Sequence, residues 1–307
     1  MVRLNHQQLK IFVLTAQLGK LVKVAELLDL KQPTVTFHLN RLQETLGVQL
    51  FNKTKSQQWI LTDAGSAFYH YANQIVQLTK EAEMLMKEYE GLNRGKVHLG
   101  ASYTPASYIL PFHLAEFQKE HSNVHVSLMV KKAPSILERV KNYELDLGVM
   151  AYGQLHESEL NVIPVMEDEL VIIMHPDHPL SQLETLTISE LDRYSFILHE
   201  KKAVSRILTD KWAVENRAKL KVTMEIGSIQ TIKEAIASNI GLSIVPRLTV
   251  NREIKEGKLL AKALPNYENE RHIYIIHRKN QLFTPLMEKF KKFLVSSLEM
   301  QYSKSVQ

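Results

Sequence analysis

Residues 21–47 read LVKVAELLDLKQPTVTFHLNRLQETLG and have the pattern of two short helices joined by a tight turn. The first helix is predicted from about Leu21 to Leu28, and residues 29–31 form the turn. The second begins near Gln32 and Pro33, because a proline in the first turn removes only an N–H that would be unpaired there. Apolar residues then recur at steps of four, three and four, which predicts one buried helical stripe. The stripe consists of Val35, Leu39, Leu42 and Leu46.

The other side of the second helix is predicted to be exposed. A helix held by such a stripe can place its exposed side chains in the major groove of DNA. The residues off the stripe are Gln32, Pro33, Thr34, Thr36, Phe37, His38 and Arg41. We expect Arg41 to contact phosphate. The residues expected to read bases are Gln32, Pro33, Thr34, Thr36 and Phe37. The Phe37 ring can pack on a thymine methyl group; packing against another part of its own domain is the alternative.

A small hairpin, or wing, is predicted after this helix. Two apolar segments, VQLF at 48–51 and WIL at 59–61, flank the polar residues 52–58. Lys53 and Lys55 lie near the predicted tip, where we expect them to contact the DNA backbone. A solvated loop is the alternative interpretation.

The positive charge of the chain is concentrated around this motif. Residues 1–62 contain eight Lys and Arg and three acidic residues, which gives a net charge of +5. The remaining residues contain 30 charges of each sign, so the whole formal excess lies in the first segment. Neutralisation of DNA phosphates requires a local excess of this kind.

Four short blocks of sequence occur in order through this region: VAExL at 24–28, QPxVT at 32–36, LGVxLF at 46–51 and LTDAG at 61–65. In this order they resemble the N-terminal helix-turn-helix of LysR-type transcriptional regulators. The resemblance implies a dimer, and a tetramer of such dimers, that binds double-stranded DNA, responds to a small-molecule effector and contacts RNA polymerase when it activates. Four residues depart from the family pattern and concern base preference rather than fold: Lys31, Phe37, Gln43 and Lys53.

Residues 63–93 predict a long helix with a role of its own. Its apolar residues alternate at steps of three and four over more than three heptads, which is typical of a helix that pairs with a second copy. The predicted dimer seam is Phe68, Tyr71, Ile75, Leu78, Ala82, Leu85 and Tyr89. Packing within the same chain is the alternative. Paired helices would place two recognition helices on one duplex, which predicts an operator with two-fold symmetry.

The chain is therefore divided into a winged helix-turn-helix domain (1–62), a linker helix (63–93) and an effector-binding domain (94–307). In the last part strand-like and helical segments alternate, which indicates a parallel α/β architecture. The family resemblance implies a periplasmic-binding-protein-like domain with two lobes. Lobe 1 would be about residues 96–165 with 269–307, and lobe 2 about residues 166–268.

Open α/β sheets bind ligands beyond the carboxyl ends of their strands, where helices begin. Two segments fit this rule, Ser102-Tyr103-Thr104 and Ser228-Ile229-Gln230. Hydroxyl groups and free N–H groups at helix starts suit an anion such as a carboxylate, although ordinary helix capping is the alternative. The resemblance adds Met150, Ala151 and His199 to the cleft. We expect a small anionic metabolite and no cofactor.

Other classes of function have little support in the sequence. The absence of cysteine excludes thiolate metal sites and fits a reducing cytoplasm. His175 and His178 are interleaved with prolines and lack metal-ligand spacing. No catalytic motif stands out, and no apolar run is long enough to cross a bilayer. The alternatives to a cytoplasmic regulator are a solute-binding protein or an enzyme on the same two-lobed fold, with an N-terminal extension.

Overall fold

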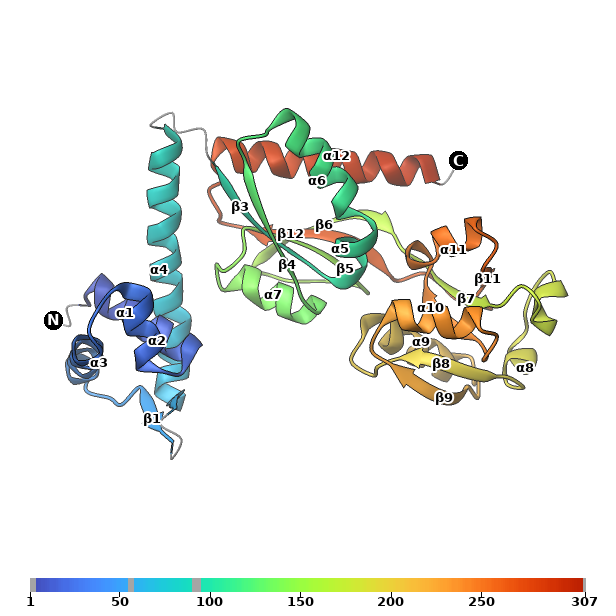
Figure 1. Ribbon diagram of the computed structural model, residues 1–307, viewed down its shortest axis with the longest axis horizontal. Coiled ribbons are helices and arrows are strands. Elements are labelled where there is room, and N and C mark those ends of the chain that lie inside the picture. The colour runs from blue at the N-terminus through green and yellow to red at the C-terminus, as the bar shows by residue number, and fades with distance from the viewer. Residues whose placement is uncertain (1–3, 55–57, 90–94, 306–307) are drawn as a thin grey trace. The chain divides into compact units, whose positions relative to one another are not determined.

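The structure, a computed structural model, describes residues 4–54, 58–89 and 95–305, and at 84, 87–89 and 302–305 it describes the backbone alone. The chain divides into two compact units. The first contains the chain up to Gly95 together with Asn142–Glu144, and the second contains Lys96–Lys141 and the chain from Leu145 onward. Figure 1 shows a mainly helical first unit and a second unit in which helices cover sheets.

The first unit is a winged helix-turn-helix followed by one long helix. Its elements are α1 (His6–Leu18), α2 (Leu21–Leu28), α3 (Gln32–Leu46), the antiparallel strands β1 (Phe51–Lys53) and β2 (Trp59–Leu61), and α4 (Asp63–Tyr89). The predicted stripe of α3 packs on Ile11 and Phe12 of α1, with Val35, Leu39 and Leu42 buried and Leu46 at the edge of the cluster. The fold predicted for this region is confirmed.

Two left-handed residues end the helices of the motif. Asp29 follows α2 with φ 53°, and its N–H donates to the carbonyls of Ala25 and Glu26. Gly47 follows α3 with φ 70° and is its left-handed cap. These two residues fix where each helix stops, and therefore fix the direction in which α3 leaves the turn.

The LTDAG block joins the wing to α4 by close backbone contact. The Oγ1 of Thr62 accepts the N–H of Gly65 at 2.9 Å and donates to the carbonyl of Gln49 at 2.8 Å. A Cβ atom on Gly65 would overlap the carbonyl oxygen of Leu50. Glycine is therefore required here for space, and the block anchors the start of α4 against the strand that enters the wing.

Lobe 1 of the second unit contains a five-stranded sheet in the order β4-β3-β5-β12-β6. Its strands are β3 (Lys96–Ala101), β4 (His125–Val130), β5 (Leu147–Tyr152), β6 (Leu160–Glu167) and β12 (His272–Arg278). Figure 1 shows α6 (Leu110–Glu120) and α12 (Pro285–Ser305) on one face of this sheet and α7 (Ala133–Lys141) on the other. The buried residues form one apolar cluster on each face, so both faces of the sheet are covered.

Lobe 2 contains two small sheets joined at one point. A three-stranded sheet has the order β10-β7-β11, and a two-stranded sheet pairs β8 with β9. A β-bridge between Phe196 and Leu242 links the two sheets. The strands are β7 (Leu170–Met174), β8 (Ser195–His199), β9 (Lys221–Ile226), β10 (Ser243–Pro246) and β11 (Leu260–Ala263). The helices are η1 (Pro179–Gln182), α8 (Ile188–Leu191), α9 (Val204–Glu215), α10 (Ile229–Ala237), η2 (Arg247–Thr249) and α11 (Asn251–Lys255).

The prediction of a parallel architecture is wrong for half of this unit. Among the described strands, the parallel pairs are those of β3 with β4 and β5 in lobe 1 and of β8 with β9 in lobe 2. Strand β12 returns from lobe 2 and enters the first sheet between β5 and β6, antiparallel to both. Strands β10 and β11 likewise run antiparallel to β7. For β12 the reason is that the chain returns from lobe 2, and a returning segment can pair in the opposite direction without a crossover helix.

The helical segment between β3 and β4 is divided in two. Its two parts, α5 (Tyr103–Tyr108) and α6, are separated at Ile109, whose φ and ψ are −122° and −64°. Pro111 lies in the first turn of α6. Its ring would clash with the carbonyl four residues earlier in a continuous helix, so the chain breaks before it.

Candidate functional site

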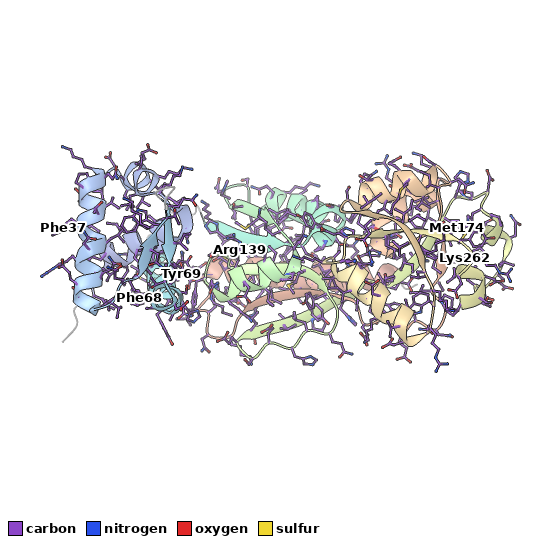
Figure 2. All side chains as sticks on the ribbon, turned by 90° about the horizontal axis from the view of Figure 1, so that it is seen from below. Phe37, Phe68, Tyr69, Arg139, Met174 and Lys262 are labelled. Carbon is purple, nitrogen blue, oxygen red and sulfur yellow. The ribbon has the colours of Figure 1, made fainter. Side chains whose placement is uncertain are left out.

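The outer face of α3 is open to solvent. Phe37 is 63% exposed, and Figure 2 shows it at the outer edge of the first unit. Its ring lies edge-on to that of His38, with 5.6 Å between ring centroids. Among its predicted neighbours, Gln32 and Pro33 are exposed, whereas Thr34, Thr36 and His38 are half-buried. An exposed ring of this size is poorly explained by packing inside its own domain.

Two of the three cationic residues predicted to contact phosphate are described, and both are exposed. Arg41 is exposed, and its Nη1 pairs with Glu44 at 3.2 Å. An exposed ion pair is worth little, so a phosphate can replace Glu44 at small cost. Lys53 is exposed on β1. Lys55 lies outside the described residues.

Gln43 has a structural role that the sequence did not reveal. Its Oε1 accepts the backbone N–H groups of Leu50 at 2.8 Å and of Phe51 at 3.4 Å. This contact fastens the entry of the wing to α3. A glutamate oxygen can accept the same two N–H groups, which explains how the chain tolerates Gln43 where the family pattern has glutamate.

Helix α4 carries two apolar stripes. Ala72 and Val76 are buried in the core of the first unit, and the ring of Phe68 lies 5.2 Å from that of Phe12. In the predicted seam, Tyr71 is 64%, Ile75 41% and Leu78 49% exposed. Phe68 therefore belongs to the packed stripe, contrary to prediction.

The remaining seam positions lie farther along α4. Ala82 is exposed and Leu85 is half-buried, while the side chain of Tyr89 lies outside the described residues. Within the described part of the helix, the free stripe therefore contains Tyr71, Ile75 and Leu78 with Ala82 and Leu85 beyond them.

In the second unit a cavity of about 80 Å³ lies between the two lobes. A water molecule needs about 10–15 Å³, so there is room for a small molecule. Of the predicted residues, the lining includes Ser102, Tyr103, Thr104, Ala151, His199 and Ile229. It also includes four charged residues that were not predicted, namely Lys132, Glu200, Lys202 and Arg271.

Ser102 is held rigidly at the end of β3. It is 6% exposed, and its Oγ accepts the N–H of Ala151 at 2.9 Å. Its own N–H donates to the carbonyl of Val149 at 3.0 Å. A hydroxyl oxygen that accepts one hydrogen bond keeps its own hydrogen to donate. Ser102 can therefore donate to an anion in the cavity.

The charged residues reach the cavity from separate elements. Lys132 of lobe 1 pairs with Glu200 of lobe 2 at 2.8 Å, and this hydrogen bond lowers the pKa of the Glu200 carboxyl. Burial lowers the pKa of His199. The Nη2 of Arg271 donates to Thr104 Oγ1 at 3.3 Å across 167 positions of sequence. No sequence spacing signals a contact of that range.

Three predicted residues do not line the cavity. Met150 is fully buried in the cluster on the α7 face of the sheet, because successive residues of β5 point to opposite faces and Ala151 takes the cavity side. The Oγ of Ser228 accepts the N–H of Thr231 at 3.3 Å, which is the ordinary capping role. Gln230 is exposed and donates to Glu234 at 2.9 Å.

The histidine pair singled out in the sequence shapes a turn. His178 is buried, its Nδ1 accepts the N–H of Leu180 at 3.2 Å, and its ring packs on Tyr194. Among the residues that the structure describes, no group of three or more His, Asp or Glu side chains is placed to hold a metal ion. In the same residues, no helix has both the length and the apolarity to cross a membrane.

Two family models match the chain. One described as bacterial regulatory helix-turn-helix protein, lysR family, matches residues 6–66, and one described as LysR substrate binding domain matches residues 90–299. Together they define a DNA-binding transcriptional regulator with a domain for a small-molecule effector. The chain belongs to the LysR family. The prediction of a regulator is confirmed, and the enzyme and solute-binding alternatives are set aside.

Individual relatives agree with this assignment. The transcriptional regulator CysL of Bacillus subtilis is 28% identical over 96% of each chain. Full-length OxyR from Pseudomonas aeruginosa shares the fold, with a TM-score of 0.75 at 20% identity over 96% of this chain and 95% of that one. The regulatory domain of Synechocystis PCC6803 CcmR, solved in complex with 2-PG, has a TM-score of 0.61 at 26% identity and covers 67% of this chain and 98% of its own.

Proposed function

We propose that this regulator reads its operator with α3 and touches phosphate with the wing. One observation carries the proposal. The segment that contains the exposed face of α3 also holds the whole formal excess of positive charge. Base contacts are assigned to Gln32, Pro33, Thr34, Thr36 and Phe37, and phosphate contacts to Arg41, Lys53 and Lys55. His38 is a further DNA-binding residue of the same helix. The domain limits proposed are 1–62, 63–93 and 94–307. Acting on DNA places the protein in the cytoplasm, and when it activates, RNA polymerase is its further partner.

The free stripe of α4 is proposed to pair with a second copy of the chain. The exposed Tyr71, Ile75 and Leu78 lie at heptad spacing and carry apolar area that one chain leaves in water. Leu78→Glu should convert the dimer to monomers in sedimentation velocity, whereas Lys80→Glu on the exposed polar side should not. An unchanged dimer in Leu78→Glu would place the dimer contact elsewhere. A tetramer would be a pair of such dimers.

A small anion in the cavity between the lobes is proposed as the effector. Three cationic side chains line the cavity, Lys132, Lys202 and Arg271, against the single carboxylate of Glu200. The CcmR regulatory domain, solved with 2-PG, supports a small ligand in this kind of domain. Effector binding would change the arrangement of the two lobes and, through it, the way in which the dimer binds DNA.

Calorimetric titration with 2-PG tests the cavity directly. Ser102→Ala should weaken binding by at least about tenfold, because a hydrogen bond to a charged group contributes about 1.5–3 kcal/mol. Ser296→Ala on the outer face of α12 is the matched control and should bind like the wild type. Equal affinity in Ser102→Ala and the control would show that Ser102 is not part of the site.

A further inference from the structure

Two segments carry the chain between the lobes, and one buried ion pair joins them. The first segment lies between Glu167 of β6 and Leu170 of β7, and the second lies between Ala263 of β11 and His272 of β12. Asp168 belongs to the first and Arg271 to the second. The Asp168 N–H donates to the Arg271 carbonyl at 3.0 Å, and their side chains form an ion pair in which Asp168 is 1% and Arg271 2% exposed.

The same guanidinium also belongs to the effector cavity. Arg271 lines the cavity, and its Nη2 donates to Thr104 Oγ1 of lobe 1. Its Nη1 reaches the Asp168 carbonyl at 3.4 Å as well as the carboxylate. Burial lowers the pKa of Arg271 to about 9, which still leaves the side chain charged at neutral pH. One cation is therefore shared between the segments that connect the lobes and the space where a ligand would lie.

We propose that Arg271 is the cation that recognises the anionic group of the effector, and that sharing Arg271 between this anion and Asp168 couples occupancy of the cavity to the two connecting segments. The inference rests on the proposed function, an anion bound between the lobes. An anion that draws the guanidinium toward the cavity weakens its hold on Asp168. The link between the two connecting segments then loosens when the effector binds.

Arg271 is better placed for this role than the two lysines of the cavity. Lys132 is already paired with Glu200, and both side chains are about half exposed, so water screens their charges. Lys202 is exposed. The charge of Arg271 acts in a buried setting, where electrostatic interactions are several times stronger than at the surface. Its planar fork also offers paired N–H donors to a carboxylate or a phosphate.

The role of Asp168 supplies a test that a purely structural ion pair would not pass. If Asp168 competes with the effector for Arg271, then Asp168→Asn should tighten anion binding, since the amide no longer holds the guanidinium by charge. Removal of a nearby negative charge also tightens anion binding by reducing repulsion, so the test is whether the gain depends on Arg271. If Arg271 only stabilises the fold, Asp168→Asn should tighten binding as much in the Arg271→Gln background as in the wild-type background.

The full-length protein is titrated by calorimetry with 2-PG and with inorganic phosphate at constant ionic strength. We expect Arg271→Gln to bind about tenfold more weakly and Asp168→Asn about fivefold more tightly than the wild type, in line with charge-assisted contacts. The double variant Asp168→Asn with Arg271→Gln replaces the ion pair by two amides of similar size, keeps the fold, and should bind as weakly as Arg271→Gln. Thermal unfolding by circular dichroism checks that each variant is folded.

Arg247→Gln is the matched control. Arg247 follows β10 close to the connecting segments, but it pairs with the exposed Glu169 at 3.2 Å. It should bind both probes like the wild type. Equal affinity of Arg271→Gln and the wild type, or weaker binding by Asp168→Asn, would overturn the inference while leaving an anion site at Ser102 in place. Binding of neither probe to any of these proteins would overturn the inference together with the anionic effector.

Discussion

The two units of this regulator use polar residues in opposite ways. On α3 the residues assigned to DNA stand on an open face, and Phe37 is 63% exposed. In the cavity proposed for the effector, Arg271 is 2% exposed and is already engaged by Asp168 and Thr104. A separate buried stripe positions α3, so its outer face can change without loss of the fold. In the second unit the buried side chains that stabilise the fold also line the cavity proposed for the effector, so the account ties function to stability there.

The largest expected effect is the loss of stability of the second unit when the Asp168 charge and its contacts are removed. Asp168→Ala leaves Arg271 as an uncompensated buried charge, which costs about 3–5 kcal/mol. Urea unfolding of the second unit, followed by circular dichroism, should show a correspondingly lower midpoint. Glu169→Ala, which breaks the exposed pair with Arg247, is the control and should change the midpoint little. Equal midpoints for the two variants would mean that the buried pair is not structural.

Gly65→Ala tests the first unit at its tightest contact. The added Cβ would overlap the carbonyl of Leu50, and such overpacking costs about 1–3 kcal/mol. DNA binding should fall because the wing is displaced, while unfolding of the second unit stays unchanged. Ser66→Ala changes the next residue of α4, which is exposed, and should bind DNA normally. Normal DNA binding by Gly65→Ala would show that the LTDAG contact does not position the wing.

Phe37→Ala separates base reading from stability. Loss of an apolar contact to a thymine methyl should reduce discrimination at one base position by about 1 kcal/mol and leave the unfolding midpoint unchanged. Arg41→Gln is the contrasting variant. Loss of one phosphate contact should reduce the slope of log affinity against log salt concentration by about one, and by the same amount for every DNA sequence. Competition binding over a set of operator variants measures both. A uniform loss of affinity in Phe37→Ala would assign the ring to packing.

The smallest expected effect is a pH dependence confined to the second unit. Burial lowers the pKa of His178 and of His277 in the folded protein. The unfolded chain therefore takes up protons near pH 6.5 before the folded one does, so stability is lost as pH falls below about 6.5. The urea midpoint of the second unit should decline between pH 7.5 and 5.5. The double variant His178→Asn with His277→Asn should show a shallower decline, and an unchanged decline would contradict the assignment.

The sequence predicts the first unit well because its signals are local. The stripe of α3 and the Gly47 cap lie within one 27-residue stretch and need no distant partner. The effector cavity is different, since Thr104 and Arg271 meet across 167 positions. Met150 was misassigned because a family resemblance does not say which face of β5 a residue occupies. Gln43 was missed as a support of the wing because its partners are backbone N–H groups, which leave no mark in side-chain patterns.

The central claim is that this chain recognises a specific operator with two-fold symmetry. The most direct measurement is selection of fragments from the genome that encodes the protein, with the purified full-length chain, followed by sequencing. We expect enrichment of a few intergenic fragments that share an interrupted inverted repeat, whose neighbouring genes then nominate the effector. Uniform, salt-sensitive retention of all fragments, with and without candidate anions, would contradict the claim.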